Sequence, residues 1–275
     1  MKDKLIEQTY NTMMIFAKEL INQLQIKYPS SSIDDWQGYL VQRLSLSLQS
    51  YHTFTRVLLE EEDYITANTI LRMMADNLAI TKFIYVDHEG DMRLLCHYLF
   101  LLDGSLTYLK HTDSMIDYNN QIAIERERCQ KEAQNIQNQI TKLPIYKGLH
   151  EEIDSLIDVD KRISNWRYKD FNDKKRVSFH ELYKVLITDP NIIAYLEYIS
   201  QFAHGLGLCS LGTVASKQNV PFLLGIRDML LGLFIENIFS IFTKQSFNDD
   251  ILLENLQTQF TPSEMDCFLK MIYTK

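Results

Sequence analysis

The stretch TANTILRMMADNLAITKFIYV, residues Thr66–Val86, decides the fold that we expect for this chain. Its apolar residues recur at the spacing of an α-helix, and further apolar side chains widen the stripe around the helix. The stripe comprises Ala67, Ile70, Leu71, Met74, Leu78, Thr81 and Tyr85. A helix of this kind is buried on most of its circumference, so we expect it to lie at the centre of a helical bundle.

Two charged residues, Arg72 and Asp76, lie within this apolar helix. Residues four apart face the same side of a helix, and a buried guanidinium without a carboxylate would be costly. We therefore predict that Arg72 and Asp76 form an ion pair. Two interpretations stay open: a structural pair that fixes the register of neighbouring helices, or part of a functional site.

Composition predicts an all-α protein built as a multi-helix bundle. The 275 residues are 46% hydrophobic and include only 5 Pro and 9 Gly. No run alternates between apolar and polar residues for long enough to compete with the helical patterns. We expect roughly nine to eleven helices, mostly antiparallel, in a single domain over residues 1–275. Its core would cover roughly 38–243, with a long helix over 112–142 that protrudes, pairs or covers the bundle, and a helical appendage over 244–275.

Capping residues place several helix ends. A first helix over Lys4–Tyr28 should stop at Pro29, because proline cannot continue it. The acidic run Glu60–Asp63 reads as a solvated connection whose last carboxylates cap the central helix. A later helix should begin at Asp189-Pro190, with aspartate as N-cap and proline in the first turn.

A basic segment stands out in a chain of net charge -8. The segment KRISNWRYKDFNDKKR, residues Lys161–Arg176, holds seven basic residues against two acidic ones, with aromatic residues between them. This composition suits an RNA or nucleotide ligand, and it also suits a surface loop pinned by aromatic anchors. The candidate ligand-binding residues here are Trp166, Arg167, Lys174, Lys175 and Arg176.

The helix that follows Asp189 carries Glu197, Ser200 and His204 on one face. His204 lies in its last turn, where the helix dipole favours the charged imidazole. Ser200 lies mid-helix, where we expect its hydroxyl to bond back to the carbonyl of Leu196, so a serine nucleophile is disfavoured. Arg72, Asp76 and His204 remain the candidate catalytic residues, with Ser200 as a candidate ligand contact.

Several classes of site lack their motifs. The cysteines form no CxxC pair, and no Glu-x-x-His pair, HExxH, P-loop or GxGxxG is present, so we expect neither a metal nor a cofactor. A lone histidine such as His97 is more often hydrogen-bonded structure than a ligand. The segment Val220–Phe242 has the length of a membrane span, but Arg227 and Asp228 interrupt it, which favours a core helix. We expect a cytoplasmic protein with no membrane contact.

The chain resembles bacterial and phage helical proteins grouped as domain of unknown function 5677. That family looks like an early helix with Arg-x-x-x-Glu, a tryptophan in the middle and a later helix with Tyr-x-x-x-Ser-x-x-x-His. The matching residues are Arg72 with Asp76, Trp166, and Ser200 with His204, where Asp76 replaces Glu and Leu196 replaces Tyr. The match covers roughly Leu40–Gly212 and brings no activity with it.

More distantly, the chain is similar to the HEPN superfamily, many of whose members are ribonucleases in toxin or antiphage systems. The Arg-x4-6-His motif usual there is absent around His204. Two hypotheses follow. In the first, the chain is a binding module whose polar interior organises the bundle and whose exposed helices recognise a partner, with a second copy as one option. In the second, it cleaves RNA or modifies a nucleotide, with His204 as acid or base and Arg72 on a phosphate.

Overall fold

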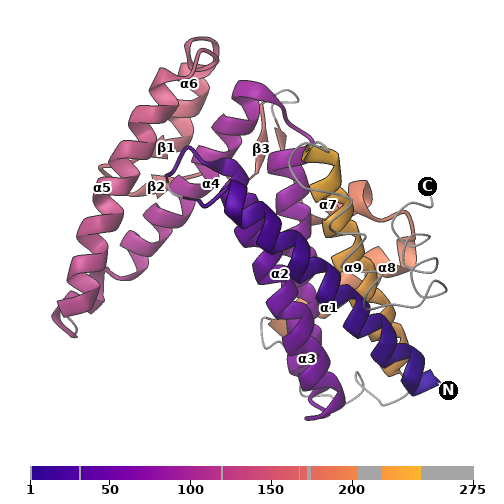
Figure 1. The fold of residues 1–275 in the computed structure, drawn as a ribbon. Helices are drawn as coiled ribbons and strands as arrows, with labels where there is room; N and C mark the ends of the chain where they lie inside the picture. Colours follow the sequence, from indigo (N-terminus) through magenta and orange to yellow (C-terminus); the bar gives the residue numbers. More distant parts are fainter. Residues whose placement is uncertain are drawn as a thin grey trace. The chain divides into compact units, whose positions relative to one another are not determined.

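The computed structural model describes residues 2–30, 32–118, 120–166, 168–171, 175–203 and 219–242. Within these ranges the chain is mostly helical, with nine α-helices packed as a bundle of antiparallel neighbours, which confirms the expected fold class (Figure 1). The helices are α1 (Lys2–Lys27), α2 (Trp36–Leu59), α3 (Tyr64–Thr81), α4 (Gly90–His111), α5 (Asn120–Lys142), α6 (Tyr146–Leu156), α7 (Phe179–Leu186), α8 (Pro190–Ala203) and α9 (Val220–Ile241).

Short elements connect the helices. A π-helical turn, η1 (Lys82–Val86), follows α3, and a 3-10 turn, η2 (Asp113–Tyr118), follows α4. Four two-residue strands form two antiparallel hairpins, in which Ile157 pairs with Ser164 and Lys169 pairs with Arg176. The strands are β1 (Ile157–Asp158), β2 (Ile163–Ser164), β3 (Lys169–Asp170) and β4 (Lys175–Arg176).

Internal contacts divide the chain into two compact units. Unit 1 draws on Met1–Ser31, Gln37–Lys82 and Phe179–Lys275, and unit 2 draws on Ser32–Trp36 and Phe83–Ser178. The single domain over 1–275 therefore stays a prediction, and each unit is described by itself below.

Helix α3 is the centre of unit 1, where it packs against α7, α8 and α9. Its apolar stripe is buried as predicted except at Ile70, which is half-buried, and Leu71 and Leu78 are fully enclosed. Met73, on the opposite side, is 56% exposed. Asn77 and Thr81 also receive hydrogen bonds from the guanidinium of Arg43 on α2, at 3.2 Å to the Asn77 carbonyl and 2.8 Å to Thr81 Oγ1.

The predicted helix starts are confirmed by their capping bonds. The backbone N–H of Thr66 donates to Asp63 Oδ1 at 3.0 Å, and the N–H of Asn191 donates to Asp189 Oδ1 at 2.8 Å. The end of α3 differs from the prediction, because α-helical bonding stops at Thr81 and the remaining residues to Val86 form η1. A π-helical turn widens the helix, and here it places Tyr85 beside a buried histidine of α4.

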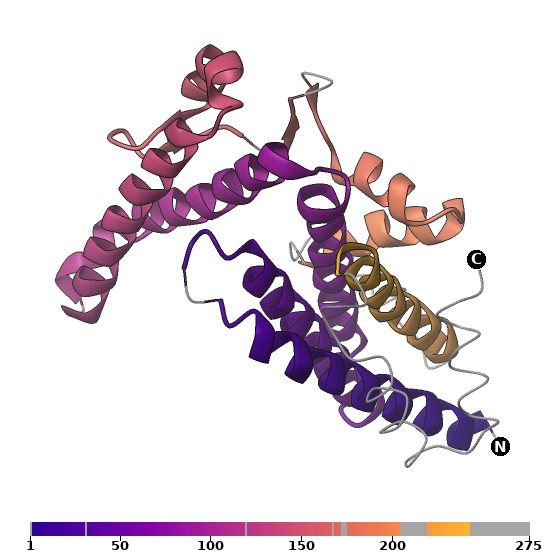
Figure 2. The same ribbon diagram turned by 45° about the horizontal axis from the view of Figure 1, so that its top comes forward.

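Helices α4 and α5 form the body of unit 2, and Figure 2 draws them side by side. The segment 112–142 is not one helix, since η2 precedes α5. Helix α5 buries one face, including Ala133, Ile136 and Ile140, and leaves polar residues exposed on the other. This amphipathic pattern explains why a segment with few large apolar residues still packs.

Helix α9 is a core helix of unit 1, as predicted, with Leu231, Phe234 and Ile235 completely buried. Among the described helices, none combines the length and the hydropathy that crossing a membrane requires.

Candidate functional site

The predicted pair between Arg72 and Asp76 is present on α3. Arg72 Nε lies 3.0 Å from Asp76 Oδ1 and 3.1 Å from Oδ2, and the two side chains are 11% and 29% exposed. Arg72 Nη1 donates a second hydrogen bond, of 2.7 Å, to the carbonyl of Leu196 on α8. The guanidinium therefore links α3 to α8 as well as pairing with its own helix.

Two aromatic rings from α7 complete this network. The hydroxyl of Tyr183 donates to Asp76 Oδ1. The guanidinium carbon of Arg72 lies 4.9 Å from the centre of the Tyr183 ring and 5.4 Å from that of Phe179. Burial, followed by the negative charge of Asp76, raises the pKa of Tyr183 far above its ordinary value, so this hydroxyl stays a donor. The arrangement is a satisfied charge pair, which suits a structural role.

A second polar link joins α3 to α8 one turn earlier. The hydroxyl of Tyr195 donates to Asn68 Oδ1 at 2.7 Å, and Asn68 Nδ2 donates to the carbonyl of Tyr64 at 2.9 Å. Asn68 is 1% exposed, so these bonds satisfy an amide that water does not reach.

The predicted face of α8 is described in part. Ser200 Oγ donates to the carbonyl of Glu197 at 2.6 Å, so the expected bond to Leu196 was wrong; that carbonyl accepts from Arg72. The Glu197 carboxylate instead accepts from His180 Nδ1 at 2.5 Å, between side chains that are 43% and 44% exposed. An exposed pair of this kind contributes about 1 kcal/mol or less. His204 lies outside the described residues.

A second buried arginine, on α9, was not among the predicted site residues. Arg227 is completely buried and donates to Asp228 Oδ1 at 2.9 and 2.7 Å and to Thr55 Oγ1 at 2.6 Å. The hydroxyl of Tyr51 donates to the same carboxylate oxygen at 2.8 Å, and the Arg227 guanidinium carbon lies 4.3 Å from its ring centre. This network fastens α9 to α2.

The basic segment forms the β-hairpins of unit 2, where carboxylates pair with three of its cations. Lys161 Nζ lies 2.8 Å from Asp158 Oδ2, and Lys169 pairs with Glu152. Arg176 is exposed and donates to the carbonyl of Asn165 at 3.2 Å. Arg167 and Lys174 lie outside the described residues, and Lys175 is described only as a backbone position of β4.

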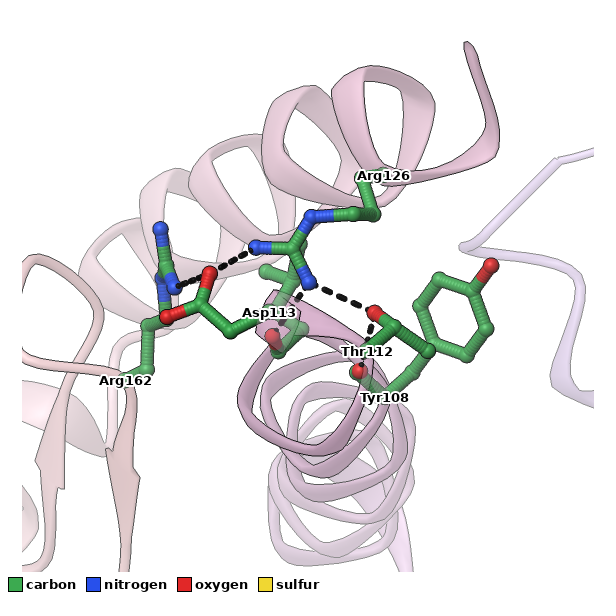
Figure 3. Close-up of polar contacts among 6 residues, drawn as sticks. Tyr108, Thr112, Asp113, Arg126 and Arg162 are labelled. Carbon is green, nitrogen blue, oxygen red and sulfur yellow. Dashed lines mark hydrogen bonds and ion pairs between the residues drawn. The ribbon is translucent and has the colours of Figure 1, made fainter. Parts of the chain in front are cut away.

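Arg162, the third paired cation, joins the basic segment to the end of α4 (Figure 3). Its Nη1 lies 2.6 Å from Asp113 Oδ1, which also accepts from Arg126 Nη2 at 2.5 Å. Arg126 Nη1 donates to the carbonyl of Leu109 at 2.5 Å and to Thr112 Oγ1 at 2.6 Å, which satisfies the last turn of α4. The hydrogen bond from Arg162 is the largest cause that lowers the pKa of Asp113.

Trp166 is an anchor of this segment. Its side chain is 1% exposed, and its ring centre lies 5.3 Å from that of Tyr168 and 6.4 Å from that of Phe83. Phe171 is 3% exposed. Buried rings offer no face on which a base could stack, so these positions favour the interpretation as aromatic anchors over ligand contacts.

Unit 2 also holds a pocket that the sequence did not indicate. It has a volume of about 740 Å³ and lies between α5 and the turn Ser32–Asp34. Its α5 residues recur at i, i+3, i+4 and i+7, so they share one face of the helix. We call this face the α5 stripe; it consists of Arg128, Lys131, Glu132 and Asn135.

Two side chains of α4 form hydrogen bonds with the turn Ser32–Asp34. His97 is completely buried, with Nε2 at 2.9 Å from the carbonyl of Ile33 and Nδ1 at 2.8 Å from the hydroxyl of Tyr85. A carbonyl only accepts, so Nε2 carries the proton and Nδ1 accepts from tyrosine. Tyr98 donates to Asp34 Oδ1 at 2.6 Å. The prediction that His97 is structural is confirmed, and the Asp34 carboxylate is fixed in place.

The charges of the α5 stripe are only partly neutralised. Lys131 Nζ lies 2.6 Å from Glu127 Oε1, between side chains that are 76% and 70% exposed. Arg128 and Glu132 are four residues apart, yet they form no ion pair with each other or with another described residue. Arginine N-terminal to glutamate is the weaker orientation for such a pair. Both groups therefore stay available on the same face of the helix.

Comparison with protein families, with characterised proteins and with solved structures finds no match to this chain. The resemblance to domain of unknown function 5677 therefore stays a prediction. In the part of the chain that the structure describes, no group of three or more His, Cys, Asp or Glu side chains is placed to hold a metal ion.

Proposed function

We propose that this chain is a cytoplasmic binding module that recognises a protein partner through the α5 stripe and the adjoining pocket. The observation that carries the proposal is that three charged residues line one pocket. The Asp34 carboxylate is held in place by Tyr98, and Arg128 and Glu132 carry unneutralised charges of opposite sign. Exposed charges held in fixed positions give specificity to an encounter between proteins.

The shape of the site favours a protein over a small molecule. The α5 stripe extends over eight residues, from Arg128 to Asn135, which is about 10 Å of helix. Ile124 lies one turn before Arg128 on the same face and is 62% exposed. Small ligands bind in concave sites that bury most of their surface, whereas an exposed isoleucine beside a charged helix face is typical of a protein interface.

The networks around Arg72 and Arg227 support a scaffold role for the charged interior, because both guanidinium groups donate hydrogen bonds to groups of the protein itself. The second hypothesis, an RNA-cleaving or nucleotide-modifying protein, gains less support. Carboxylates already pair with Lys161, Arg162 and Lys169, which lowers the positive charge that the basic segment offers to a phosphate backbone.

A photoreactive amino acid placed at single positions tests this proposal. It would replace Asn135 on the α5 stripe or, as a matched control, Lys184, which is exposed on α7. After irradiation in cells, we expect a discrete adduct from position 135 and none of the same mass from position 184. The absence of any adduct at position 135, or the same adduct at both, would overturn the proposal.

A further inference from the structure

We infer that the partner is a second copy of this chain, with α5 paired antiparallel to α5 across a two-fold axis. The inference rests on the proposed function and deepens it by naming the partner. In this arrangement Arg128 of each copy lies opposite the partner's Glu132, so the axis creates two ion pairs from one pair of residues.

Symmetry supports this choice. A two-fold interface brings the same patch of both subunits together, so the patch must complement itself. The α5 stripe meets that condition because it carries Arg128 and Glu132 one helical turn apart, both exposed or half-exposed and neither paired with a residue that the structure describes. A partner of uniform charge would satisfy only one of the two signs.

Charge also selects the direction of the helices. If the two α5 helices ran parallel in register, each Arg128 would face the same residue of its partner, and so would each Glu132, which is destabilising. In the antiparallel register the residue opposite Lys131 is the partner's Cys129, and the residue opposite Glu125 is the partner's Asn135. No like charges then lie opposite one another.

The same register gives Ile124 a place to bind. Along the helix axis it falls level with position 136 of the partner helix, one residue from the partner's Asn135, which lines the pocket. The lining of the pocket includes the apolar residue Ile33 as well as polar groups. The side chain of Ile124, 62% exposed in one copy, would be covered when the partner's pocket receives it.

Charge exchange on the chain of 275 residues tests the inference. Sedimentation velocity over a concentration series would compare the wild type with Arg128→Glu, Glu132→Arg and the double variant that carries both substitutions. We expect a wild-type dimer, a dissociation constant raised about ten-fold or more in each single variant, and recovery to within about three-fold in the double variant. Raised salt should weaken the wild-type dimer.

The control is Lys142→Glu, an exposed change on α5 outside the stripe, which should leave association unchanged. Circular dichroism and melting temperature identify any variant that fails to fold. If a single variant fails to fold, the comparison of the wild type with the double variant decides. A wild-type chain that stays monomeric, or a double variant that does not recover, would overturn the inference. A crosslink from Asn135 to a protein of another mass, together with a monomeric chain, would refute the dimer and leave the proposed function standing.

Discussion

Tyr183 on α7 donates its hydroxyl to the Asp76 carboxylate on α3, the same carboxylate that pairs with Arg72. Because Arg72 also bonds the carbonyl of Leu196, one charge network joins three helices. Loss of any one member leaves the others with unsatisfied polar groups in a site that is mostly buried.

Replacing Arg72 with alanine should lower the free energy of unfolding by about 3 kcal/mol, because Asp76 loses its cation and the Leu196 carbonyl loses its donor. Urea unfolding followed by circular dichroism measures the change. The matched control is Arg56→Ala, which breaks an exposed pair of 3.6 Å with Glu61 and should cost less than about 1 kcal/mol. Equal losses in the two variants would show that the Arg72 network is not structural.

The Tyr183 hydroxyl gives the network a pH dependence. Its pKa is raised in the folded chain, so above pH 10 the unfolded chain loses a proton that the folded chain keeps. Its contribution is therefore complete below pH 10 and declines as the pH rises. Tyr183→Phe should be about 2 kcal/mol less stable than the wild type at pH 8, and the gap should shrink by about 1 kcal/mol between pH 10 and 11. Urea unfolding at each pH checks this, and a gap that stays constant would contradict it.

The pair of Arg227 and Asp228 allows a test of whether two charged residues contribute to stability together. Arg227→Met should cost about 3 kcal/mol or more, because Asp228 keeps only the bond from Tyr51. Adding Asp228→Asn removes the remaining charge and keeps an oxygen for Tyr51, so the double variant should recover at least half of the loss. Chemical unfolding of the single and double variants forms a cycle, and additive losses would show that the two residues do not act together.

The sequence was sufficient for the centre of unit 1, because the evidence lay within one helix. Apolar spacing identified α3, and the four-residue separation identified the pair between Arg72 and Asp76. It could not identify Tyr183, whose bond to Asp76 spans 107 positions of the chain. The two aromatic residues of α7, Phe179 and Tyr183, lie four apart, which was the available signal for a shared face.

The pocket of unit 2 escaped prediction for the same physical reason. The spacing of Arg128, Lys131 and Glu132 could show that they share a helix face. Only the folded chain shows that His97 and Tyr98 hold the turn Ser32–Asp34 opposite that face. The basic segment was misleading in a different way, since composition counts cations and does not reveal which of them are paired.

The stabilisation that Asp63 gives as the N-cap of α3 should depend on pH in a defined direction. Asp63→Ala should lower the free energy of unfolding by about 1 kcal/mol at pH 7, because Thr66 loses the acceptor for its backbone N–H. Hydrogen bonds from Thr66 lower the pKa of Asp63 below the 3.8 of the unfolded chain, so this stabilisation is present above pH 4 and is lost as the pH falls through the folded pKa. Urea unfolding should show the gap closing between pH 4 and pH 2. Asp63→Asn keeps an oxygen acceptor without the charge, so its gap from the wild type should be smaller than that of alanine. This gap should shrink over the same range, because only the wild type carries a group that titrates there. Parallel curves for alanine and wild type would refute the cap.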